Sequence, residues 1–202
     1  MRKIITENLR KIRLTFRNRK VKKNVNKTIL CNMCLGGVIS HDFKMKFCSP
    51  TVNLMIPANE FVSMIENLDN LNGRFRSQNS DKMYPVGLLN DKYTVHFIHY
   101  NTFSKAVDTW KRRLSRMNYS EMYFILVETA SCSYEDLVKF DSLPYEHKIA
   151  LVHKNYPEIK SARVIKGFDG KNLYGEILGY QGLWGKRMYD QINWAEFLNL
   201  GR

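Results

Sequence analysis

Short, uninterrupted apolar runs recur along the chain and give the first sign of its architecture. The clearest is MYFILVET at residues 122–129, and KIALVHK at residues 148–154 is of the same kind. Runs that stay apolar at successive positions are typical of strands buried on both faces of a sheet. We therefore predict strands at these two places. Three further strand segments are predicted at residues 27–33, 51–56 and 162–168.

Segments with helical periodicity separate these runs. Their apolar residues follow spacings of three and four, which is the pattern of a helix with one face toward a core. Candidate caps stand at their starts: Asn59, Thr102 and Ser133, the last of these with Asp136 as the partner of a capping box. The predicted helices span residues 58–71, 102–117, 133–144 and 189–201.

The order of these elements predicts the fold class. Residues 84–100 hold two strand-like runs around Asn90-Asp91, a pattern typical of a hairpin. Elsewhere strands alternate with helices, which indicates an α/β fold with three layers and a mixed, mostly parallel sheet. We find no internal repeat and no interdomain linker. The prediction is a single α/β domain at residues 28–202, preceded by a separate leader at residues 1–27.

The leader carries most of the net charge of the chain. It holds eleven basic residues and one acidic residue, so it contributes +10 to a net charge of +13. Ile5, Leu9, Ile12 and Phe16 recur at spacings of 4, 3 and 4, which predicts a basic amphipathic helix. Such a helix commonly lies on an anionic membrane surface. The alternative is that its apolar stripe packs on the domain.

Composition and short motifs exclude several classes of partner and of protein. Nucleic acid is not an expected partner, because the domain has no second basic patch and no nucleic-acid-binding motif. The apolar run Met122–Val127 is too short to span a bilayer, so we expect no transmembrane helix, and we expect no secretory signal. Four cysteines in 202 residues do not make a disulfide framework. A cytoplasmic protein with reduced thiols is the prediction.

Polar and ionisable residues gather where the predicted strands end. Asn32 and Cys34 follow the first strand, His99 follows the hairpin, and Glu128 and His153 follow the two long apolar strands. Ligands of open α/β sheets bind at the carboxyl ends of the strands. The alternative is that strand ends are solvated, so polar residues collect there without a function.

The segment at residues 29–54 allows three kinds of site. Cys31, Cys34, Cys48 and His41 could in principle hold zinc, but the spacing is not that of a zinc ribbon. A redox pair of Cys31 and Cys34 would need a helix amino terminus, whereas Gly36-Gly37 favours a turn. We expect neither a metal nor another cofactor.

The third kind of site places a phosphate or other ligand at this turn. Gly36-Gly37 would adopt positive φ and let the backbone approach the ligand closely. His41-Asp42 is a candidate base with an adjacent carboxylate to orient it. The polar side chains that would complete the site are Ser49, Thr51 and Asn53.

The motifs N-x-C-x-G-G, S-P-T-x-N, Y-P-V-G, H-Y, W-x-x-R, F-D-x-L-P and H-K are specific. In this combination, over about residues 28–199, the chain resembles a bacterial family filed as domain of unknown function 1919. That family is commonly labelled an exopolysaccharide or capsular-polysaccharide biosynthesis protein. The resemblance implies a Rossmann-like α/β fold and a polysaccharide pathway. Cys31 and Cys48 depart from the family pattern, which weakens the zinc and redox hypotheses further.

Residues of this chain that fall on the recurring family positions come from every part of the domain. They are Asn32, Cys34, Gly36, Gly37, Ser49, Pro50, Thr51, Asn53, Tyr84, Pro85, Gly87, His99, Tyr100, Trp110, Arg113, Asp141, Pro144 and His153.

The first functional hypothesis is a glycosyl- or acyltransferase that acts on a nucleotide-sugar or lipid-linked glycan at the inner membrane face. His41, His99 or His153 would be the base, and Cys34 or Ser49 would be the nucleophile of an acyl transfer. Cys34 could equally be a small buried core residue. The groups that would meet substrate phosphates are Lys154, Lys186, Arg187 and the amides of the glycine pair.

The second hypothesis is a glycan- or partner-binding module without catalysis. The tail at residues 179–194 carries Tyr180, Trp184, Tyr189 and Trp194 among glycines and basic residues, and aromatic faces can stack on sugar rings. The alternative is that Trp194 belongs to a core-facing helix and that Trp184 packs under a glycine loop.

Overall fold

The computed structural model describes residues 2–22, 25–170, 176–182 and 184–201. At its centre lies a four-stranded sheet with the order β1-β5-β6-β7, and each neighbouring pair of strands is parallel. The α/β class and the mostly parallel sheet are therefore confirmed. The strands are β1 (Thr28–Cys31), β5 (Met122–Val127), β6 (Lys148–Val152) and β7 (Ala162–Val164).

Alternate side chains of these strands enter two separate apolar cores. Leu30, Phe124 and Leu126 point to one face, whereas Ile29 and Ile125 point to the other. All five side chains are at most 1% exposed. Burial of such a side chain contributes about 1.5–3 kcal/mol, so the uniformly apolar runs are explained by cores on both faces of the sheet.

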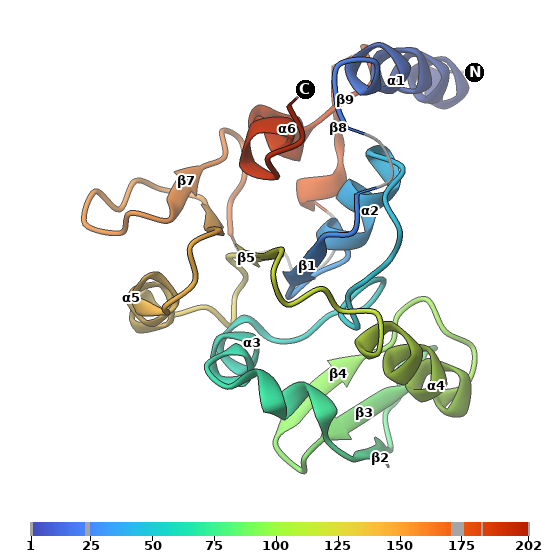
Figure 1. Ribbon diagram of the computed structural model, residues 1–202, viewed down its shortest axis with the longest axis vertical. Helices are drawn as coiled ribbons and strands as arrows, with labels where there is room; N and C mark the ends of the chain where they lie inside the picture. Colours follow the sequence, from blue (N-terminus) through green and yellow to red (C-terminus); the bar gives the residue numbers. More distant parts are fainter. Residues whose placement is uncertain (1, 23–24, 171–175, 183, 202) are drawn as a thin grey trace.

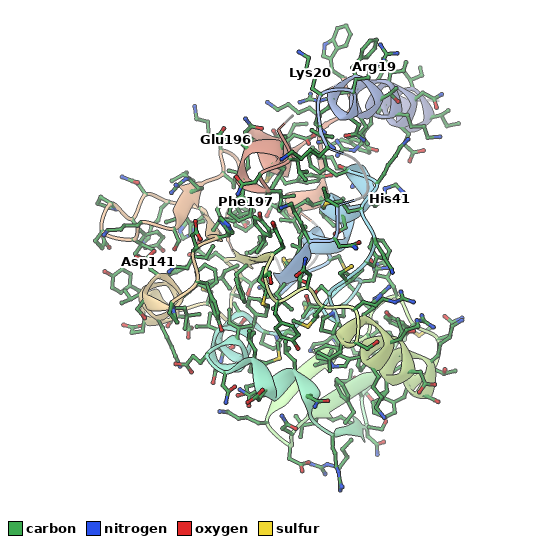
Figure 2. The ribbon with its side chains drawn as sticks, viewed as in Figure 1. Arg19, Lys20, His41, Asp141, Glu196 and Phe197 are labelled. Atoms are coloured by element: carbon green, nitrogen blue, oxygen red, sulfur yellow. The ribbon has the colours of Figure 1, made fainter. Side chains whose placement is uncertain are left out.

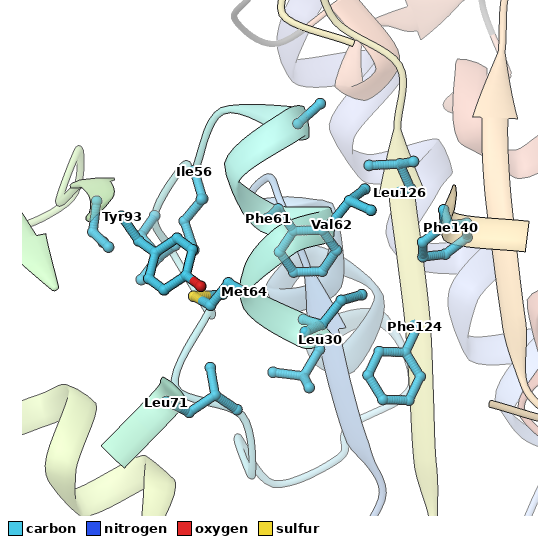
Figure 3. Close-up of a cluster of buried hydrophobic side chains, with 14 of the residues drawn as sticks. Leu30, Ile56, Phe61, Val62, Met64, Leu71, Tyr93, Phe124, Leu126 and Phe140 are labelled. Carbon is cyan, nitrogen blue, oxygen red and sulfur yellow. The ribbon is translucent and has the colours of Figure 1, made fainter. Parts of the chain in front are cut away.

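Helices cover both faces (Figure 1). Helices α3 (Ala58–Ile65), α4 (Phe103–Leu114) and α5 (Tyr134–Ser142) pack on the first core. Figure 3 shows Phe61 of α3 among side chains of the strands. Helices α2 (Leu35–Asp42) and α6 (Trp194–Phe197) pack on the second core. The three layers predicted from the alternation of elements are present.

A small antiparallel sheet with the order β2-β3-β4 flanks the first core. Its hairpin turns at Asn90 and Asp91, which have φ of 56° and 54°, so the predicted hairpin is confirmed. Strand β2 lies between the predicted helix at residues 58–71 and the predicted hairpin, where no strand was predicted. The strands are β2 (Phe75–Gln78), β3 (Val86–Leu89) and β4 (Tyr93–His96).

Local capping signals were reliable in two of three cases. Thr102 accepts a hydrogen bond from the Lys105 amide at 3.4 Å, and Ser133 and Asp136 form the predicted capping box. Asn59 does not cap α3. The helix instead begins after Pro57, and the amide at its first residue is satisfied by the distant Ser131.

Two predicted elements are wrong. Residues 51–56 form no strand, because Asn53 has φ of 63° and the segment makes only an isolated bridge to β4 through Met55. The predicted helix at residues 189–201 is broken by extended backbone at Ile192. The observed C-terminal elements are η2 (Glu176–Leu178), β8 (Tyr180–Gln181), β9 (Lys186–Arg187), η3 (Met188–Gln191) and α6.

The predicted N-terminal helix is confirmed as α1 (Arg2–Asn18), which lies at one end of the molecule (Figure 1). It is followed along the chain by β1, and a further single turn, η1 (Leu68–Asn72), follows α3. Within the part of the chain that the structure describes, no helix has the length and apolar character needed to cross a bilayer.

Candidate functional site

The carboxyl edge of the parallel sheet begins at a clamp made by Asn32, just after β1. Its Nδ2 donates to the carbonyl oxygen of Val127 at 2.9 Å, and the Val127 amide donates to its Oδ1 at 2.8 Å. The side chain is fully buried. Asn32 therefore joins the ends of β1 and β5, and the substrate contact predicted for it is not supported because its polar atoms are already used.

Next to Asn32, Glu128 and His153 form a carboxylate–imidazole pair in which the carboxylate is buried. Oε2 of Glu128 accepts from the His153 amide at 2.8 Å and lies 2.7 Å from His153 Nδ1. Its other oxygen, Oε1, accepts from the Tyr156 hydroxyl at 3.1 Å. Glu128 is 5% exposed, whereas the His153 side chain is 35% exposed. The carboxylate is thus shielded while the imidazole still reaches solvent.

This arrangement prepares one nitrogen of His153 for proton transfer. A neutral imidazole that donates from Nδ1 to a carboxylate keeps its lone pair on Nε2. Among the described residues, no hydrogen bond engages Nε2. Gly170, with φ of +70°, lies so close that an added Cβ would be 2.9 Å from Nδ1, so only glycine lets the backbone pass against the ring.

The neighbouring tyrosine and cysteine are held in their neutral forms. Burial, together with the charge of Glu128 and the hydrogen bond to it, raises the pKa of Tyr156 to about 12. Burial and the charges of Asp136 and Glu128 raise the pKa of Cys132 to about 12. Tyr156 is therefore a lasting donor to the carboxylate, and Cys132 is not an activated nucleophile.

Hydroxyl groups and one lysine complete this edge. The hydroxyls of Thr129 and Ser131 lie 3.0 Å apart, and Ser131 Oγ also accepts from the Ala58 amide at 2.9 Å. Lys154 is exposed, and its Nζ lies 5.2 Å from the centre of the Tyr156 ring. Of the cationic residues predicted from sequence, Lys154 is the one that lies beside His153.

A second set of predicted residues lies elsewhere, in a groove of about 550 Å³ between α1, α2 and the β8–β9 ribbon. We call it the α1 groove. It brings together five of the predicted site residues with side chains of α1, of the loop after α2 and of the ribbon. The lining residues are Glu7, Arg10, Lys11, Leu14, Gly37, Val38, His41, Asp42, Phe47, Asn53, Tyr180 and Arg187.

The wall of this groove is a buried ion cluster centred on Arg10, which we call the Arg10 clamp. Arg10 Nη1 donates to Asp190 at 2.8 Å and to the Gly185 carbonyl at 3.0 Å, and Nη2 donates to Asp42 and Tyr189. Tyr189 in turn donates to Asp42 at 2.6 Å. Burial opposes the charge of Arg10, but the bond to Asp190 and the surrounding negative charges raise its pKa overall.

The clamp removes the role predicted for the His41-Asp42 pair. The Asp42 carboxylate is 5% exposed and already paired with Arg10, and its Oδ1 lies 3.9 Å from His41 Nδ1. The His41 side chain is 80% exposed, and Figure 2 shows it at the outer side of α2. Asp42 therefore does not orient His41 as the carboxylate of a catalytic pair would.

The predicted glycine turn is also wrong, because Gly36 and Gly37 lie inside helix α2. They are needed for packing rather than for positive φ. An added Cβ would lie 3.0 Å from Cys31 Cβ at Gly36 and 2.9 Å from Asn53 Oδ1 at Gly37. The pair lets α2 lie close to β1 and to the following loop, and it forms no phosphate-binding turn.

Ser49 and Thr51 cover the open edge of β1. Thr51 Oγ1 accepts from the Cys31 amide at 3.1 Å, and the two hydroxyls lie 3.0 Å apart. Both residues are 1% exposed. A loop that pairs with an edge strand satisfies its backbone and prevents association with other chains. These residues therefore have a structural explanation that needs no ligand.

The remaining predicted residues are dispersed. Cys34 is 8% exposed, and burial raises its pKa to about 11, which does not support a nucleophilic thiolate. His99 is exposed in the connection between β4 and α4, and it does not follow a strand of the parallel sheet. Trp184 is 77% exposed between β8 and β9, whereas Trp194 is buried in the second core.

Sequence reasoning missed Tyr156, Ser131 and Arg10. The hydrogen bond of Tyr156 joins residues 28 positions apart, and that of Arg10 to Asp190 spans 180 positions. Such pairs leave no local pattern. Only the position of Tyr156, shortly after His153 at the end of β6, could have suggested it.

Comparison with known proteins gives a family and a relative. Residues 5–199 match the family described as "Domain of unknown function (DUF1919)". A protein of Haemophilus influenzae described as "Uncharacterized protein" is 34% identical over 177 residues, which cover 87% of this chain and 85% of that protein. The family match begins within α1, so it includes most of the N-terminal helix.

Proposed function

We propose that this chain, which belongs to the DUF1919 family, is a transferase of bacterial cell-surface polysaccharide assembly that uses His153 as its general base. The polysaccharide pathway comes from the family label that the motifs suggest. The reaction class comes from the site. In particular, the proposal depends on one observation, the pairing of His153 with the buried carboxylate of Glu128 at the carboxyl edge of the sheet.

The geometry of this pair suits the activation of a hydroxyl. Glu128 holds the imidazole by Nδ1 and stabilises the imidazolium that forms when Nε2 takes a proton. An acceptor hydroxyl that gives its proton to Nε2 can attack the anomeric or acyl carbon of a donor, while the bond to the leaving phosphate or thiol breaks. A positioned base of this kind accelerates a reaction by about 10²–10⁴-fold.

Direct transfer fits this site better than a covalent intermediate. Burial raises the pKa of Cys34 and Cys132, so neither thiol is an activated nucleophile. Lys154, next to the pair, is available to bind the phosphates of a nucleotide-sugar or of acyl-coenzyme A. These are the two donor classes that we propose.

The proposal includes the finer description of the chain. We regard residues 28–202 as a single Rossmann-like domain, and four parallel strands with helices on both faces support this. We also place the protein in the cytoplasm, at the inner face of the cell membrane, where nucleotide-sugars and lipid-linked glycans meet.

The test replaces His153 by alanine in a strain whose polysaccharide depends on this gene. Polysaccharide formed per cell and per folded protein is measured, and the transition temperature shows whether the variant is folded. We expect His153→Ala to lose activity by about 10²–10⁴-fold. His99→Ala changes a histidine for which no described carboxylate partner is seen and which follows no strand of the parallel sheet, and it is expected to retain activity. Full activity of folded His153→Ala protein would refute the proposal.

A ligand screen with the purified full chain identifies the donor. A ligand present at 100 times its Kd stabilises a protein by about 2.7 kcal/mol, which a thermal shift detects. Nucleotide-sugars and acyl-coenzyme A are compared, with Lys154→Ala as the variant that should weaken binding. A shift with one donor class and not the other would distinguish glycosyl from acyl transfer.

One observation favours a second candidate, a glycan-binding module. Trp184 is 77% exposed in the loop of the ribbon whose Tyr180 and Arg187 line the α1 groove. An exposed indole beside a groove can stack on a sugar ring. Loss of oligosaccharide binding in Trp184→Ala, with unchanged polysaccharide synthesis in His153→Ala, would favour this candidate over the enzyme.

A further inference from the structure

Helix α1 exposes an apolar stripe on the side that faces away from the domain. Ile5, Ile12 and Phe16 lie within about 40° of one another around the helix axis, given 100° per residue. They are 54%, 55% and 59% exposed. Of the two alternatives that the sequence left open, packing of this stripe on the domain is therefore not what the structure has.

The rotation of α1 is fixed by its opposite side. Thr6 and Arg10 are 6% and 4% exposed against the domain, and Arg10 is held by the clamp. Gly185 lies directly on the helix backbone, since an added Cβ would be 2.5 Å from the Arg10 nitrogen. Because the polar side is locked inward, the apolar stripe is held outward as a fixed surface.

Basic side chains border this stripe. Arg13, Arg19 and Lys20 are exposed, and the Arg19 guanidinium lies 4.9 Å from the centre of the Phe16 ring. Figure 2 shows Arg19 and Lys20 beside α1, in the turn that follows this helix. Long basic side chains of this kind extend past apolar neighbours to reach negative charges.

We infer that the exposed face of α1 binds the surface of an anionic lipid bilayer. Apolar side chains of such helices enter the boundary between headgroups and acyl chains, and lysine and arginine pair with anionic headgroups. The inference does not depend on the proposed transferase. The α1 groove lies on the opposite side of the same helix, where Glu7, Lys11 and Leu14 line it.

The charge pattern disfavours the other occupants of this face. In a two-fold dimer the same patch would meet itself, so the basic residues of two copies would repel. A nucleic acid would match the charge but leave the apolar stripe exposed to water. An anionic bilayer satisfies both features at once.

The test is flotation of the full chain with vesicles of phosphatidylcholine alone and of phosphatidylcholine mixed with anionic phosphatidylglycerol. We expect binding to the anionic vesicles and at least a tenfold weaker binding to the neutral ones. Phe16→Glu should lower the affinity for anionic vesicles by about tenfold or more, because it places a charge in the acyl boundary. Replacing Arg13 and Lys20 by alanine should lower it by roughly fivefold for each residue.

The matched control is Val138→Glu, which adds the same charge at an apolar helical position of α5 that is 43% exposed. It should bind as the parent chain does. Equal binding to neutral vesicles, no binding to anionic ones, or unchanged binding of Phe16→Glu would each overturn the inference. If the parent chain forms a dimer at high concentration and Phe16→Glu does not, the exposed face of α1 binds a second copy of the chain and the inference is wrong. Circular dichroism confirms that each variant is folded.

Discussion

Two equally buried carboxylates in this protein have similar sets of partners, but the nitrogen group paired with each differs in its exposure to solvent. Asp42 accepts from the Tyr189 hydroxyl at 2.6 Å and pairs with Arg10, which is 4% exposed. Glu128 accepts from the Tyr156 hydroxyl and pairs with His153, whose side chain is 35% exposed. Each site thus combines a carboxylate, a tyrosine and a nitrogen base.

The nitrogen base determines what each site can do. A guanidinium keeps its proton at any pH a protein survives, so the Arg10 clamp cannot exchange protons and serves to hold α1. An imidazole gains and loses a proton near neutral pH, and this one reaches solvent. The comparison therefore separates a structural site from a candidate catalytic one, although both bury a charge.

The largest effect on stability is expected at the clamp. Arg10→Met keeps an unbranched apolar stem but removes the guanidinium that contacts Asp42 and Asp190 directly. Arg17, at 4.0 Å from Asp42 and 3.9 Å from Asp190, is then the cation that remains near the two buried carboxylates. Breaking a buried ion pair in this way costs about 3–5 kcal/mol. Urea unfolding should show this decrease in the free energy of unfolding.

The matched control is Arg13→Met, an exposed arginine of the same helix, which should change the free energy of unfolding by less than about 0.5 kcal/mol. A similar loss in both variants would show that the clamp has no special role. Destabilisation below about 1 kcal/mol in Arg10→Met would mean that α1 contributes little to the folded domain.

A smaller effect on stability and a larger one on activity are expected for Glu128→Gln. A glutamine has one acceptor oxygen and places an amide donor against His153 or Tyr156, so one hydrogen bond is lost at a cost of about 1–3 kcal/mol. The imidazole loses its carboxylate at the same time, and polysaccharide synthesis should fall by at least 10²-fold. Urea unfolding and the polysaccharide assay measure the two quantities on the same protein.

The opposite ranking would contradict this comparison. If Arg10→Met, measured at a temperature where it stays folded, lost more activity than Glu128→Gln, the clamp and not the carboxyl edge would be the catalytic centre. Wild-type activity in Glu128→Gln would remove the role of the carboxylate.

A third effect concerns alkaline pH. Burial, with the nearby carboxylates, raises the pKa of Tyr189 above its usual range and that of Tyr156 to about 12. The folded state keeps these protons where the unfolded state, with tyrosine pKa near 10, loses them. The free energy of unfolding should therefore be intact below about pH 10 and fall as pH rises from 10 to 12, by up to about 1.4 kcal/mol per pH unit for Tyr189.

Tyrosine-to-phenylalanine variants sharpen this prediction. Tyr189→Phe should flatten the decrease clearly, and Tyr156→Phe less, because Tyr189 is fully buried and Tyr156 is only partly buried. Urea unfolding between pH 9 and 12 measures both slopes. An unchanged slope in Tyr189→Phe would show that its hydroxyl is not held by Asp42 in the folded state.

Elements specified by local signals could be predicted, and those specified by distant contacts could not. The hairpin turn at Asn90 and the capping box at Ser133 involve neighbours in the sequence, and both are present. Residues 51–56 look like a strand because most of them are apolar, but they make only an isolated bridge to β4 through Met55. Thr51 meets the edge of β1 with its side chain instead of its backbone. Two adjacent glycines are typical of a turn, but here Gly36 is needed because Cys31 leaves no room for a Cβ at that position. The sequence does not show this contact.

The candidate site was predictable to the same degree. The rule that ligands bind at strand ends selected Glu128 and His153, since both directly follow long apolar runs. It also selected Asn32, which likewise follows a strand but whose side-chain amide is fully hydrogen-bonded to the backbone of Val127. Polarity at a strand end could not distinguish a free functional group from one already satisfied.

The Arg10 clamp sets an order of events during synthesis. The ribosome makes Arg10 180 residues before its partner Asp190. At about 5–20 residues per second, the ribosome needs on the order of 10–40 s to make that second half of the clamp. During this time α1 has no domain to dock on, while its basic and apolar side chains are already formed. A surface that attracts α1, such as a bilayer, can therefore bind the helix before the Arg10 clamp forms. The time open for this attachment is set by the number of residues between Arg10 and Asp190.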